Sequence, residues 1–214
     1  MKLLRLLADL IYPVRCPVCG EFISREEGFC GGCRDKLEFW DGSFSVPGAD
    51  DFFAAYEYDE NIRPAIALMK QGICGNAPYA FGKALGEILR PKISGIAPDM
   101  IIPVPMYKSD LRRRGCNQAE LVAKALGREL GIPVRCDVVV KTRKTDEQKH
   151  LSRREREINL RGAFAVADSG SVRGRNMILL DDVCTTGSTL RELTGILKGS
   201  GAERVSCVCC CRVS

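Results

Sequence analysis

The sequence lacks any uninterrupted apolar run of the roughly 20 residues that a membrane-spanning helix needs. Its leucine-rich start, in which Leu3, Leu6 and Leu7 share one helical face expected to dock on the protein's own body, is interrupted by Arg5 and Asp9. No small-residue cleavage site follows, so no secretory signal is predicted. We therefore expect a cytoplasmic protein without a transmembrane segment, whose thiols stay reduced and whose paired cysteines indicate metal before disulfides.

Histidine and aromatic residues are scarce, with 1 histidine and 7% aromatic residues in 214. His150 lies in a charged stretch without an identifiable partner, which favours a solvated side chain over a catalytic base. Few aromatic side chains stand near the basic runs, Tyr107 being the nearest. Stacking on nucleic-acid bases, which uses such rings, is therefore only weakly indicated.

A phosphate-binding loop of the G-x-x-x-x-G-K-[ST] type is also missing. Residues 177–183, MILLDDV, resemble the acidic strand that accompanies such a loop in ATPases. The nearest candidate loop, Gly82-Lys83, is followed by Ala84 and lacks the preceding glycine. This absence excludes a P-loop ATPase.

The composition that is present is that of a soluble globular protein, 45% hydrophobic and 28% charged. A chain of 214 residues can bury one sizeable core and still carry a small satellite module. The net charge of +5 permits anionic partners but does not identify one.

Cysteine is abundant, with 12 in the chain, and four near the start have metal-ligand spacing. The stretch CPVCGEFISREEGFCGGC holds two C-x2-C pairs separated by ten residues. Two such pairs can close a tetrahedral thiolate shell around zinc, and four protein ligands leave no open position for catalysis. Four free buried thiols are the alternative. We predict a structural zinc ion held by Cys16, Cys19, Cys30 and Cys33, with positive backbone φ at Gly20, Gly31 and Gly32 beside the pairs.

The cysteines near the C-terminus lack this spacing. Strand alternation places Cys207, Cys209 and Cys211 on one face. Because cysteine behaves as a small buried hydrophobe, core packing is preferred there over a metal cluster.

From about residue 50 onward, strand-like and helix-like patterns alternate, after an irregular linker over residues 37–51. This rhythm predicts an α/β fold, a mainly parallel sheet flanked by helices. We place the domain boundary between residues 1–50 and 51–214. The expected strands are 52–58, 99–106, 135–140, 162–166, 177–183 and 204–213, and the expected helices follow Asn61 and span 78–89, 117–130 and 188–201.

The stretch MILLDDVCTTGSTL places two acids at a strand end, before a hydroxyl-rich turn and a helix. In open α/β sheets ligands bind beyond such strand ends, and a helix N-terminus favours phosphate. The acids Asp181 and Asp182 suit the vicinal hydroxyls of a sugar, while the turn suits its 5-phosphate. A simple helix N-cap by Thr186 or Ser188, with exposed acids, is the plainer alternative.

The same stretch resembles the phosphoribosyl pyrophosphate (PRPP) loop of type I phosphoribosyltransferases. Two further stretches, IIPVPMYKSDLRRRGCNQAELVAKAL and TRKTDEQKHLSRREREINLRGAF, resemble signature regions of the ComF family of competence proteins. The double C-x2-C module also matches that family, and the resemblance covers roughly residues 10–212. Cys116 and Cys184 depart from the usual aromatic and aliphatic residues.

The resemblance implies a PRPP site with Mg²⁺ carried largely by ligand oxygens. Asp181 and Asp182 would contact the ribose and support catalysis, if the chain is an enzyme. The implied PRPP-binding set is Asp181, Asp182, Thr185, Thr186, Gly187, Ser188, Thr189, Arg114 and Gly115. The implied phosphate contacts in a lid are Arg143, Gln148, Arg153, Arg156 and Asn159, in a stretch that also reads as a solvated charged helix.

The family is associated with natural competence, DNA uptake and transformation, so three functions remain open. The first is PRPP binding in a competence protein. The second is a non-catalytic scaffold that binds single-stranded DNA through Arg112, Arg113 and Arg114, together with other competence proteins. The third is an active phosphoribosyltransferase of nucleotide metabolism acting on a base or amine. The sequence carries no fingerprint for the acceptor or for the oligomeric state.

Overall fold

The computed structural model describes residues 13–24, 26–145, 155 and 159–214. Its centre is a four-stranded parallel sheet in the order β1-β6-β5-β2. The strands are β1 (Asp51–Glu57), β2 (Met100–Pro103), β5 (Asn176–Cys184) and β6 (Arg204–Arg212). β5 and β6 are the inner strands and are buried over most of their length, as strands covered on both faces must be.

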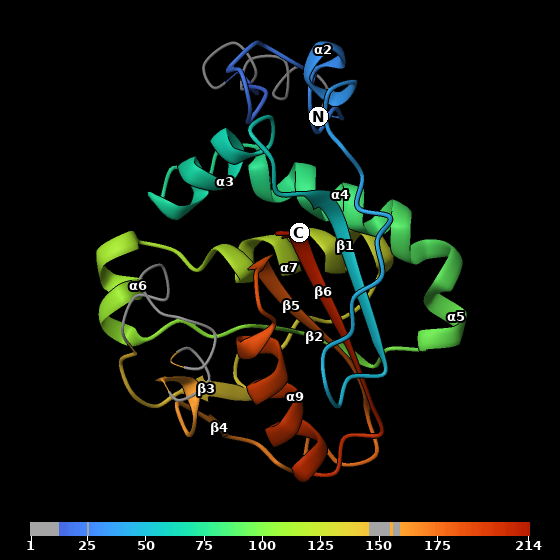
Figure 1. Cartoon of the computed structure of the whole chain (residues 1–214), viewed down its shortest axis with the longest axis vertical. Coiled ribbons are helices and arrows are strands. Elements are labelled where there is room, and N and C mark those ends of the chain that lie inside the picture. The colour runs from blue at the N-terminus through green and yellow to red at the C-terminus, as the bar shows by residue number, and fades with distance from the viewer. Residues whose placement is uncertain (1–12, 25, 146–154, 156–158) are drawn as a thin grey trace, which may run out of the picture.

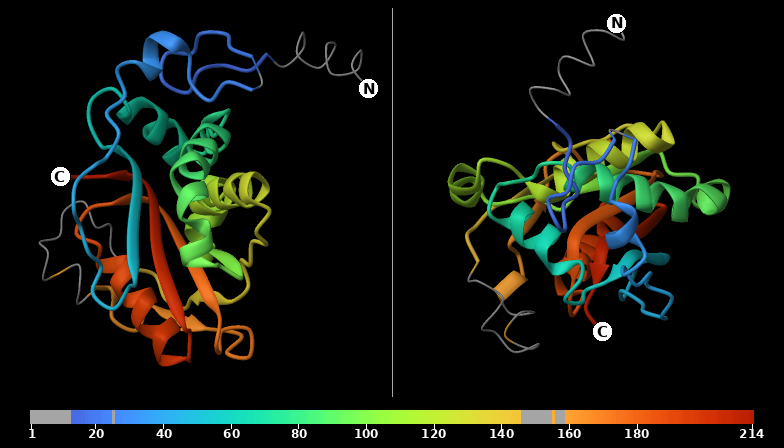
Figure 2. Two further views of the ribbon diagram at one scale, coloured as in Figure 1. Left: turned by 90° about the vertical axis from the view of Figure 1, so that its right-hand side faces the viewer. Right: turned by 90° about the horizontal axis from the view of Figure 1, so that it is seen from above.

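Helices cover both faces of this sheet (Figures 1 and 2). One face packs against α3 (Arg63–Lys70), α4 (Ala77–Leu89) and α7 (Gln118–Leu130). The other face packs against α9 (Ser188–Gly199) and the short strands described below. Two apolar clusters therefore fill the protein, one on each side of the sheet, and the predicted α/β class is confirmed.

The predicted helices form within a few residues of their expected bounds. Pro64 stands in the first turn of α3, where a missing N–H costs nothing. Gly131 ends α7 in the left-handed conformation, with φ 72°. α4 and α7 approach closely because α4 carries glycine there: a Cβ on Gly82 would lie 2.5 Å from the Cβ of Ala125. The sequence reasoning missed α6 (Lys108–Arg114), which follows β2, and the short α5 (Ile93–Ile96), which follows the 3-10 turn η1 (Arg90–Lys92).

Two predicted strands do not join the main sheet. β3 (Val139–Lys141) and β4 (Phe164–Val166) pair with each other in antiparallel fashion as a separate two-stranded sheet. A parallel pair would need a crossover packed on the sheet between its strands, whereas antiparallel partners need only a return of the chain. Strand rhythm alone could not distinguish these two arrangements.

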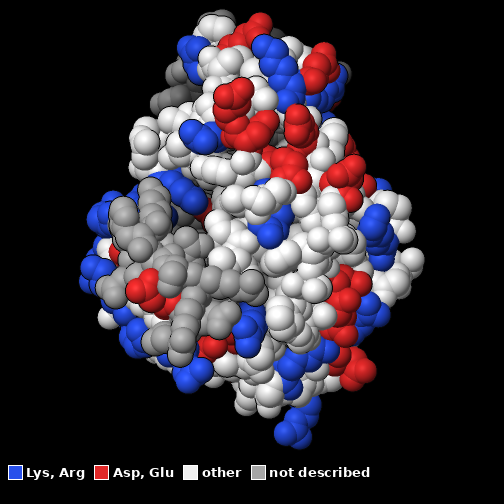
Figure 3. Space-filling model, in the orientation of Figure 1, with Lys and Arg blue, Asp and Glu red and all other residues white. Residues whose placement is uncertain are grey.

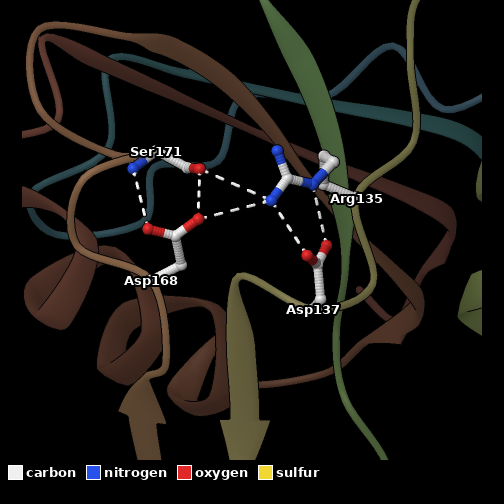
Figure 4. Close-up of polar contacts among 4 residues, drawn as sticks. All are labelled: Arg135, Asp137, Asp168 and Ser171. Atoms are coloured by element: carbon white, nitrogen blue, oxygen red, sulfur yellow. Dashed lines mark hydrogen bonds and ion pairs between the residues drawn. The ribbon is translucent and has the colours of Figure 1, made fainter.

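A polar cluster joins the segments that flank this small sheet (Figure 4). The Arg135 guanidinium, before β3, donates two hydrogen bonds to the Asp137 carboxylate, at 2.8 and 2.9 Å. The same guanidinium reaches Asp168 and Ser171, after β4, at 3.4 Å each. Ser171 in turn donates its hydroxyl and its backbone N–H to Asp168. The entry to β3 is thereby tied to the exit from β4.

The four-cysteine module (residues 13–37) lies beyond the α4 side of the sheet, at the top of Figure 1. It contains the one-turn helix α2 (Gly31–Arg34) and docks on α4. The Phe29 ring meets the rings of Tyr56 and Phe81 edge-on, at 5.8 and 5.9 Å between centroids. Carbonyl groups of the module accept hydrogen bonds from Asn76 and Lys83 of the α4 region. The predicted boundary near residue 50 therefore separates two parts that share one apolar cluster.

No described helix has the length and apolar character needed to cross a membrane. The segment after the module is irregular, as expected, and runs along β1, where the Trp40 backbone N–H donates to the Ala55 carbonyl at 3.2 Å. The predicted helix over the first residues lies outside the part of the chain that the structure describes.

Candidate functional site

A cavity of about 860 Å³ opens at the carboxyl edge of the parallel sheet, where β2 and β5 end side by side. Its floor is formed by the loop that leaves β5. One wall is the end of α3, and the opposite wall comprises α6 and the start of α7. This is the position at which open α/β sheets bind ligands. The charged and amide side chains that line it include Lys70, Arg114, Asn117, Lys141, Asp181 and Asp182.

The two predicted acids stand at the end of β5 and line the cavity. The Asp182 N–H donates to Oδ1 of Asp181 at 2.9 Å, and the Val183 N–H donates to Oδ1 of Asp182 at 2.7 Å. Burial and the neighbouring Asp182 carboxylate raise the pKa of Asp181 well above its usual range. A carboxylate pair in this setting is stabilised by hydroxyl donors or cations that approach from the cavity.

One such cation is already present. The Lys70 ammonium, at the end of α3, lies 3.9 Å from Oδ2 of Asp182, whose side chain is 19% exposed. Lys70 and the acids are far apart in sequence, so no local motif could have pointed to this pair. The lysine brings a positive charge to the rim of the acidic floor.

The hydroxyl-rich turn from Thr185 to Thr189 leads directly into α9. The hydroxyl groups of Thr186 and Ser188 are 2.7 Å apart, and the Ser188 N–H approaches Thr186 Oγ1 at 3.4 Å. The helix N-cap is Gly187, with φ 74°, and not Thr186 or Ser188 as the plainer alternative expected. A left-handed residue is needed at that point of the turn, and glycine adopts this conformation without strain.

Gly187 also packs tightly against a neighbour from the linker. A Cβ at Gly187 would lie 3.0 Å from Cζ of Phe44. The Phe44 ring is covered in turn by the Arg212 guanidinium, 4.1 Å from the ring centroid. Arg212 donates to the Cys184 carbonyl at 3.3 Å, so the linker, the end of β6 and the turn support one another.

The opposite wall contains the predicted Arg114, whereas the predicted Gly115 lies next to it without lining the cavity. Arg114 ends α6 and lines the cavity, and Gly115 follows it as the left-handed C-cap, with φ 81°. Asn117 and Gln118, which follow Cys116, hold this turn in place. The Asn117 amide donates to the Val104 carbonyl at 3.0 Å, and the buried Gln118 amide donates to the Met69 carbonyl at 2.8 Å. These bonds hold the α6–α7 turn against the ends of β2 and α3.

The predicted lid residues are only partly described. Gln148, Arg153 and Arg156 lie outside the described residues. Arg143 donates to the carbonyl groups of Asn159 and Arg161, at 2.8 and 2.9 Å, and is not among the residues that line the cavity. The contacts of Arg143 thus join the two ends of this segment.

Lys141 is the cavity residue that the sequence reasoning missed most clearly. It ends β3, lines the cavity and donates to Oγ1 of Thr145 at 2.8 Å. Burial lowers the pKa of Lys141, while the carboxylates of Asp110 and Asp181 oppose that shift. Its position depends on how the small sheet packs, which no sequence pattern reveals.

The four predicted zinc ligands come together in the module. Their Sγ atoms all lie within 4.8 Å of one another, and those of Cys19 and Cys30 are 3.6 Å apart. Tetrahedral zinc with Zn–S bonds of about 2.3 Å needs sulfur atoms roughly 3.8 Å apart, so this set fits the ion. The expected positive φ occurs only at Gly20, at 79°. Gly31 and Gly32 instead begin α2, where helical φ is required.

Comparison with known families matches both parts of the chain. Residues 113–214 match the phosphoribosyl transferase domain, and residues 7–45 match the double zinc ribbon domain. The second match supports zinc as the structural ion of the four-cysteine module.

Named relatives align along most of this chain. The competence protein F of Haemophilus influenzae is 42% identical over 198 residues, covering 89% of this chain and 81% of its own. The DNA utilization protein YhgH of Escherichia coli K12 is 33% identical over 200 residues, covering 92% and 83%. The competence protein ComFC of Bacillus subtilis is 26% identical over 198 residues, covering 88% and 74%.

Solved structures give weaker matches. The glutamine phosphoribosylpyrophosphate amidotransferase of B. subtilis covers 61% of this chain and 26% of its own, at 22% identity and a TM-score of 0.40. The purine phosphoribosyltransferase of Pyrococcus horikoshii covers 60% and 67%, at 21% identity and a TM-score of 0.36. Overlaps at these scores are too weak to assign a family.

The sequence matches are sufficient to assign the family without the solved structures. A phosphoribosyl transferase domain and a double zinc ribbon occur in one chain, and the alignments along most of its length reach 42% identity. This chain therefore belongs to the competence protein F (ComF) family.

Proposed function

We propose that this protein binds PRPP with Mg²⁺ in the cavity at the carboxyl edge of the sheet and serves DNA uptake in natural competence. The observation that carries the proposal is the floor of the cavity, where an acid pair adjoins a hydroxyl-rich turn at the start of a helix. A ribose 5-phosphate matches both features, because its diol donates hydrogen bonds and its phosphate accepts them.

In this proposal the floor and the walls of the cavity contact different parts of PRPP. Asp181 and Asp182 accept hydrogen bonds from the ribose hydroxyls, which relieves the repulsion between the two carboxylates. The turn from Thr185 to Thr189 and the N-terminus of α9 hold the 5-phosphate. Arg114 and Lys70, on opposite walls, face the pyrophosphate and balance its charge. The donor set fits Mg²⁺ carried on the ligand, since carboxylate, hydroxyl and phosphate oxygens are what that ion prefers.

Titration calorimetry with PRPP and Mg²⁺ tests this directly. We expect saturable binding to the wild type, weakened by Asp181→Asn or Asp182→Asn by about tenfold to a hundredfold each, since a charge-assisted hydrogen bond contributes about 1.5–3 kcal/mol. Asp41→Asn, at an exposed linker position, is the matched control and should bind as the wild type does. Equal affinities of all four proteins would reject the site.

Catalysis is a further step within the same proposal. If an acceptor displaces pyrophosphate at the anomeric carbon, positive charge develops on the ribose, and in this proposal the Asp182 carboxylate stabilises it. A screen for pyrophosphate release across bases and amines, with and without DNA, separates an active transferase from a binding protein.

A second candidate function is direct binding of single-stranded DNA by α6. Lys and Arg side chains gather on the face of the molecule that carries this helix (Figure 3). Lys108 and Arg112 are exposed there. Relatives are named for DNA utilization, which favours such a partner.

The dependence of DNA affinity on salt tests this candidate. Replacing Lys108 and Arg112 by Gln should lower the slope of log affinity against log salt by about 1.4, because each phosphate that is no longer neutralised removes about 0.7 from it. Neither change touches the acid pair, so PRPP binding should persist. An unchanged slope would show that these two side chains of α6 do not neutralise DNA phosphates.

A further inference from the structure

Two cysteines outside both cysteine-rich segments lie in contact. The Sγ atoms of Cys74 and Cys116 are 3.1 Å apart, although the residues are 42 positions apart in the chain. Cys74 stands in the loop between α3 and α4, and Cys116 stands in the turn between α6 and α7. Both side chains are half-buried, and both thiols are free.

The backbone around the pair is held in place by its neighbours. Gly72 has φ 84°, and a Cβ there would collide with the Arg114 carbonyl oxygen, so the two loops touch directly. The buried Gln118 amide donates to the Met69 carbonyl at 2.8 Å and to the Cys116 carbonyl at 3.4 Å. The proximity of the sulfur atoms is therefore a consequence of loop packing.

Forming a bond requires only a small movement. A disulfide has an S–S distance of about 2.05 Å, so the sulfur atoms must approach by roughly 1 Å. Cys74 lines an open groove of about 800 Å³ between α4 and α7, and Cys116 is itself partly exposed, so a small reagent can reach either sulfur atom. The buried thiols of β6 have no comparable exposure.

We propose that Cys74 and Cys116 are a redox-sensitive thiol pair, which a low-molecular-weight disulfide such as oxidised glutathione converts into an intramolecular disulfide. The Cys116 thiolate attacks one sulfur of oxidised glutathione and displaces one glutathione thiolate. The Cys74 thiol then loses its proton, attacks the Cys116 sulfur and displaces the second. Two protein thiols are oxidised, and one glutathione disulfide is reduced to two thiols.

The surroundings of the two thiols indicate which one attacks glutathione first. Burial, reinforced by the adjacent Cys116, raises the pKa of Cys74 to about 12. The Gln118 amide approaches the Cys116 sulfur at 3.8 Å and can donate to a thiolate there. Because the thiolate is the nucleophile and this donor stands beside Cys116, we assign the first attack to Cys116.

The bridge would join two walls of the cavity. Cys74 follows the end of α3, which carries Lys70, and Cys116 follows Arg114 by two residues. Oxidation thus constrains the cavity without modifying any residue that lines it. The reaction itself does not depend on what the cavity binds.

The test uses the full-length, zinc-loaded protein equilibrated in glutathione redox buffers, alkylated, digested and analysed by mass spectrometry without reduction. We expect one cross-linked peptide that contains Cys74 and Cys116, the loss of two thiols, and a melting temperature raised by several degrees, because the bridge constrains the unfolded chain. Exposed Cys136 should remain alkylated in the same sample. If Cys74 and Cys116 are both fully alkylated in oxidised glutathione, the proposal is overturned.

Single variants test the order of attack. Cys74→Ser should trap one glutathione on Cys116, whereas Cys116→Ser should leave Cys74 unmodified. Cys136→Ser is the matched control and should still form the bridge. Zinc content and circular dichroism verify that each variant is folded. Because no PRPP is added, failure here leaves the proposed function intact, and failure of PRPP binding leaves this result intact.

Discussion

Cysteine serves two different purposes at the two ends of this chain. The four near the N-terminus come from paired turns, and their sulfur atoms converge within 4.8 Å. The four on β6 are fully buried and pack into the apolar clusters on the two faces of the sheet, and the buried Thr194 hydroxyl lies 3.5 Å from Sγ of Cys207. Cys207 and Cys209 pack into one apolar cluster, and Cys210 and Cys211 pack into the other. The same residue type is a ligand where the backbone gathers it and a core residue where a strand distributes it.

The difference follows from how much apolar surface each region can bury. The four-cysteine module contributes few fully buried hydrophobic residues, so a bound ion must supply much of its folding energy. β6 lies at the centre of the sheet, where small apolar side chains are needed between two layers of helices. One expectation was wrong in detail: Cys211 does not share the face of Cys207 and Cys209.

The largest effect should come from breaking the metal site. Replacing Cys16 and Cys30 by Ala should abolish zinc binding and unfold the module, because structural zinc contributes about 10–16 kcal/mol in zinc-finger peptides. Zinc content by atomic emission and protease sensitivity of residues 13–37 measure this. Cys210→Ala, a change of the same type on β6, should retain the zinc. A double variant that keeps a full equivalent of zinc would disprove the assignment.

The next effect concerns the docking of the module on α4. Phe29→Ala removes a ring that packs against the rings of Tyr56 and Phe81, and should cost about 3–5 kcal/mol of the free energy of unfolding. Zinc should remain bound, since no ligand is changed. Denaturant unfolding gives the value, with Phe22→Ala as control, because that ring is 60% exposed. Similar costs for both variants would indicate that the module does not dock as described.

A smaller effect is expected on β6. Cys210→Ser buries a hydroxyl group in an apolar layer, and should lower the free energy of unfolding by about 1–3 kcal/mol. Cys210→Ala introduces no polar group and should cost less, as measured by the same denaturant titration. If Cys210→Ala lowers the free energy of unfolding more than Cys210→Ser does, the Cys210 thiol makes a polar interaction that core packing does not explain.

The smallest expected change in the free energy of unfolding concerns the acid pair, which lies beside β6. Burial, followed by Cys211 and the two acids, raises the pKa of Cys210, so these neutral thiols lie beside the floor of the cavity. The raised pKa of Asp181 means that the folded state binds its proton more tightly than the unfolded state does. The resulting stabilisation is complete below the ordinary carboxyl pKa of about 4 and is lost as the pH rises through the raised value.

Asp181→Asn replaces the titrating carboxyl by a neutral amide, so the variant does not lose this stability as the pH rises. At neutral pH we expect the variant to be more stable than the wild type by about 0.5–2 kcal/mol, while it binds PRPP more weakly. The difference in stability should shrink as the pH falls to 4 and below, because Asp181 then becomes protonated in the unfolded chain as well. Thermal unfolding from pH 4 to 8 measures it. A difference independent of pH would contradict the inferred pKa.

The sequence predicted those parts of the site that are contiguous in the chain. The acid pair and the turn after β5 were found because a strand, two acids and a helix start follow one another within 14 residues. Lys70 and Lys141 were missed because they reach the cavity from other elements. The separate β3–β4 sheet was also missed, since short strands carry no signal for parallel or antiparallel pairing.

Local order in the chain by itself determined the four-cysteine cluster, the hydroxyl-rich turn before a helix and the α/β class, because each depends on spacing or periodicity within a few turns of backbone. Only the tertiary structure decided which cation faces the acids, that Phe44 packs against Gly187, and which cysteines meet. Cys74 and Cys116 illustrate the reason: their contact depends on the packing of two loops, and loop packing is settled by the whole core.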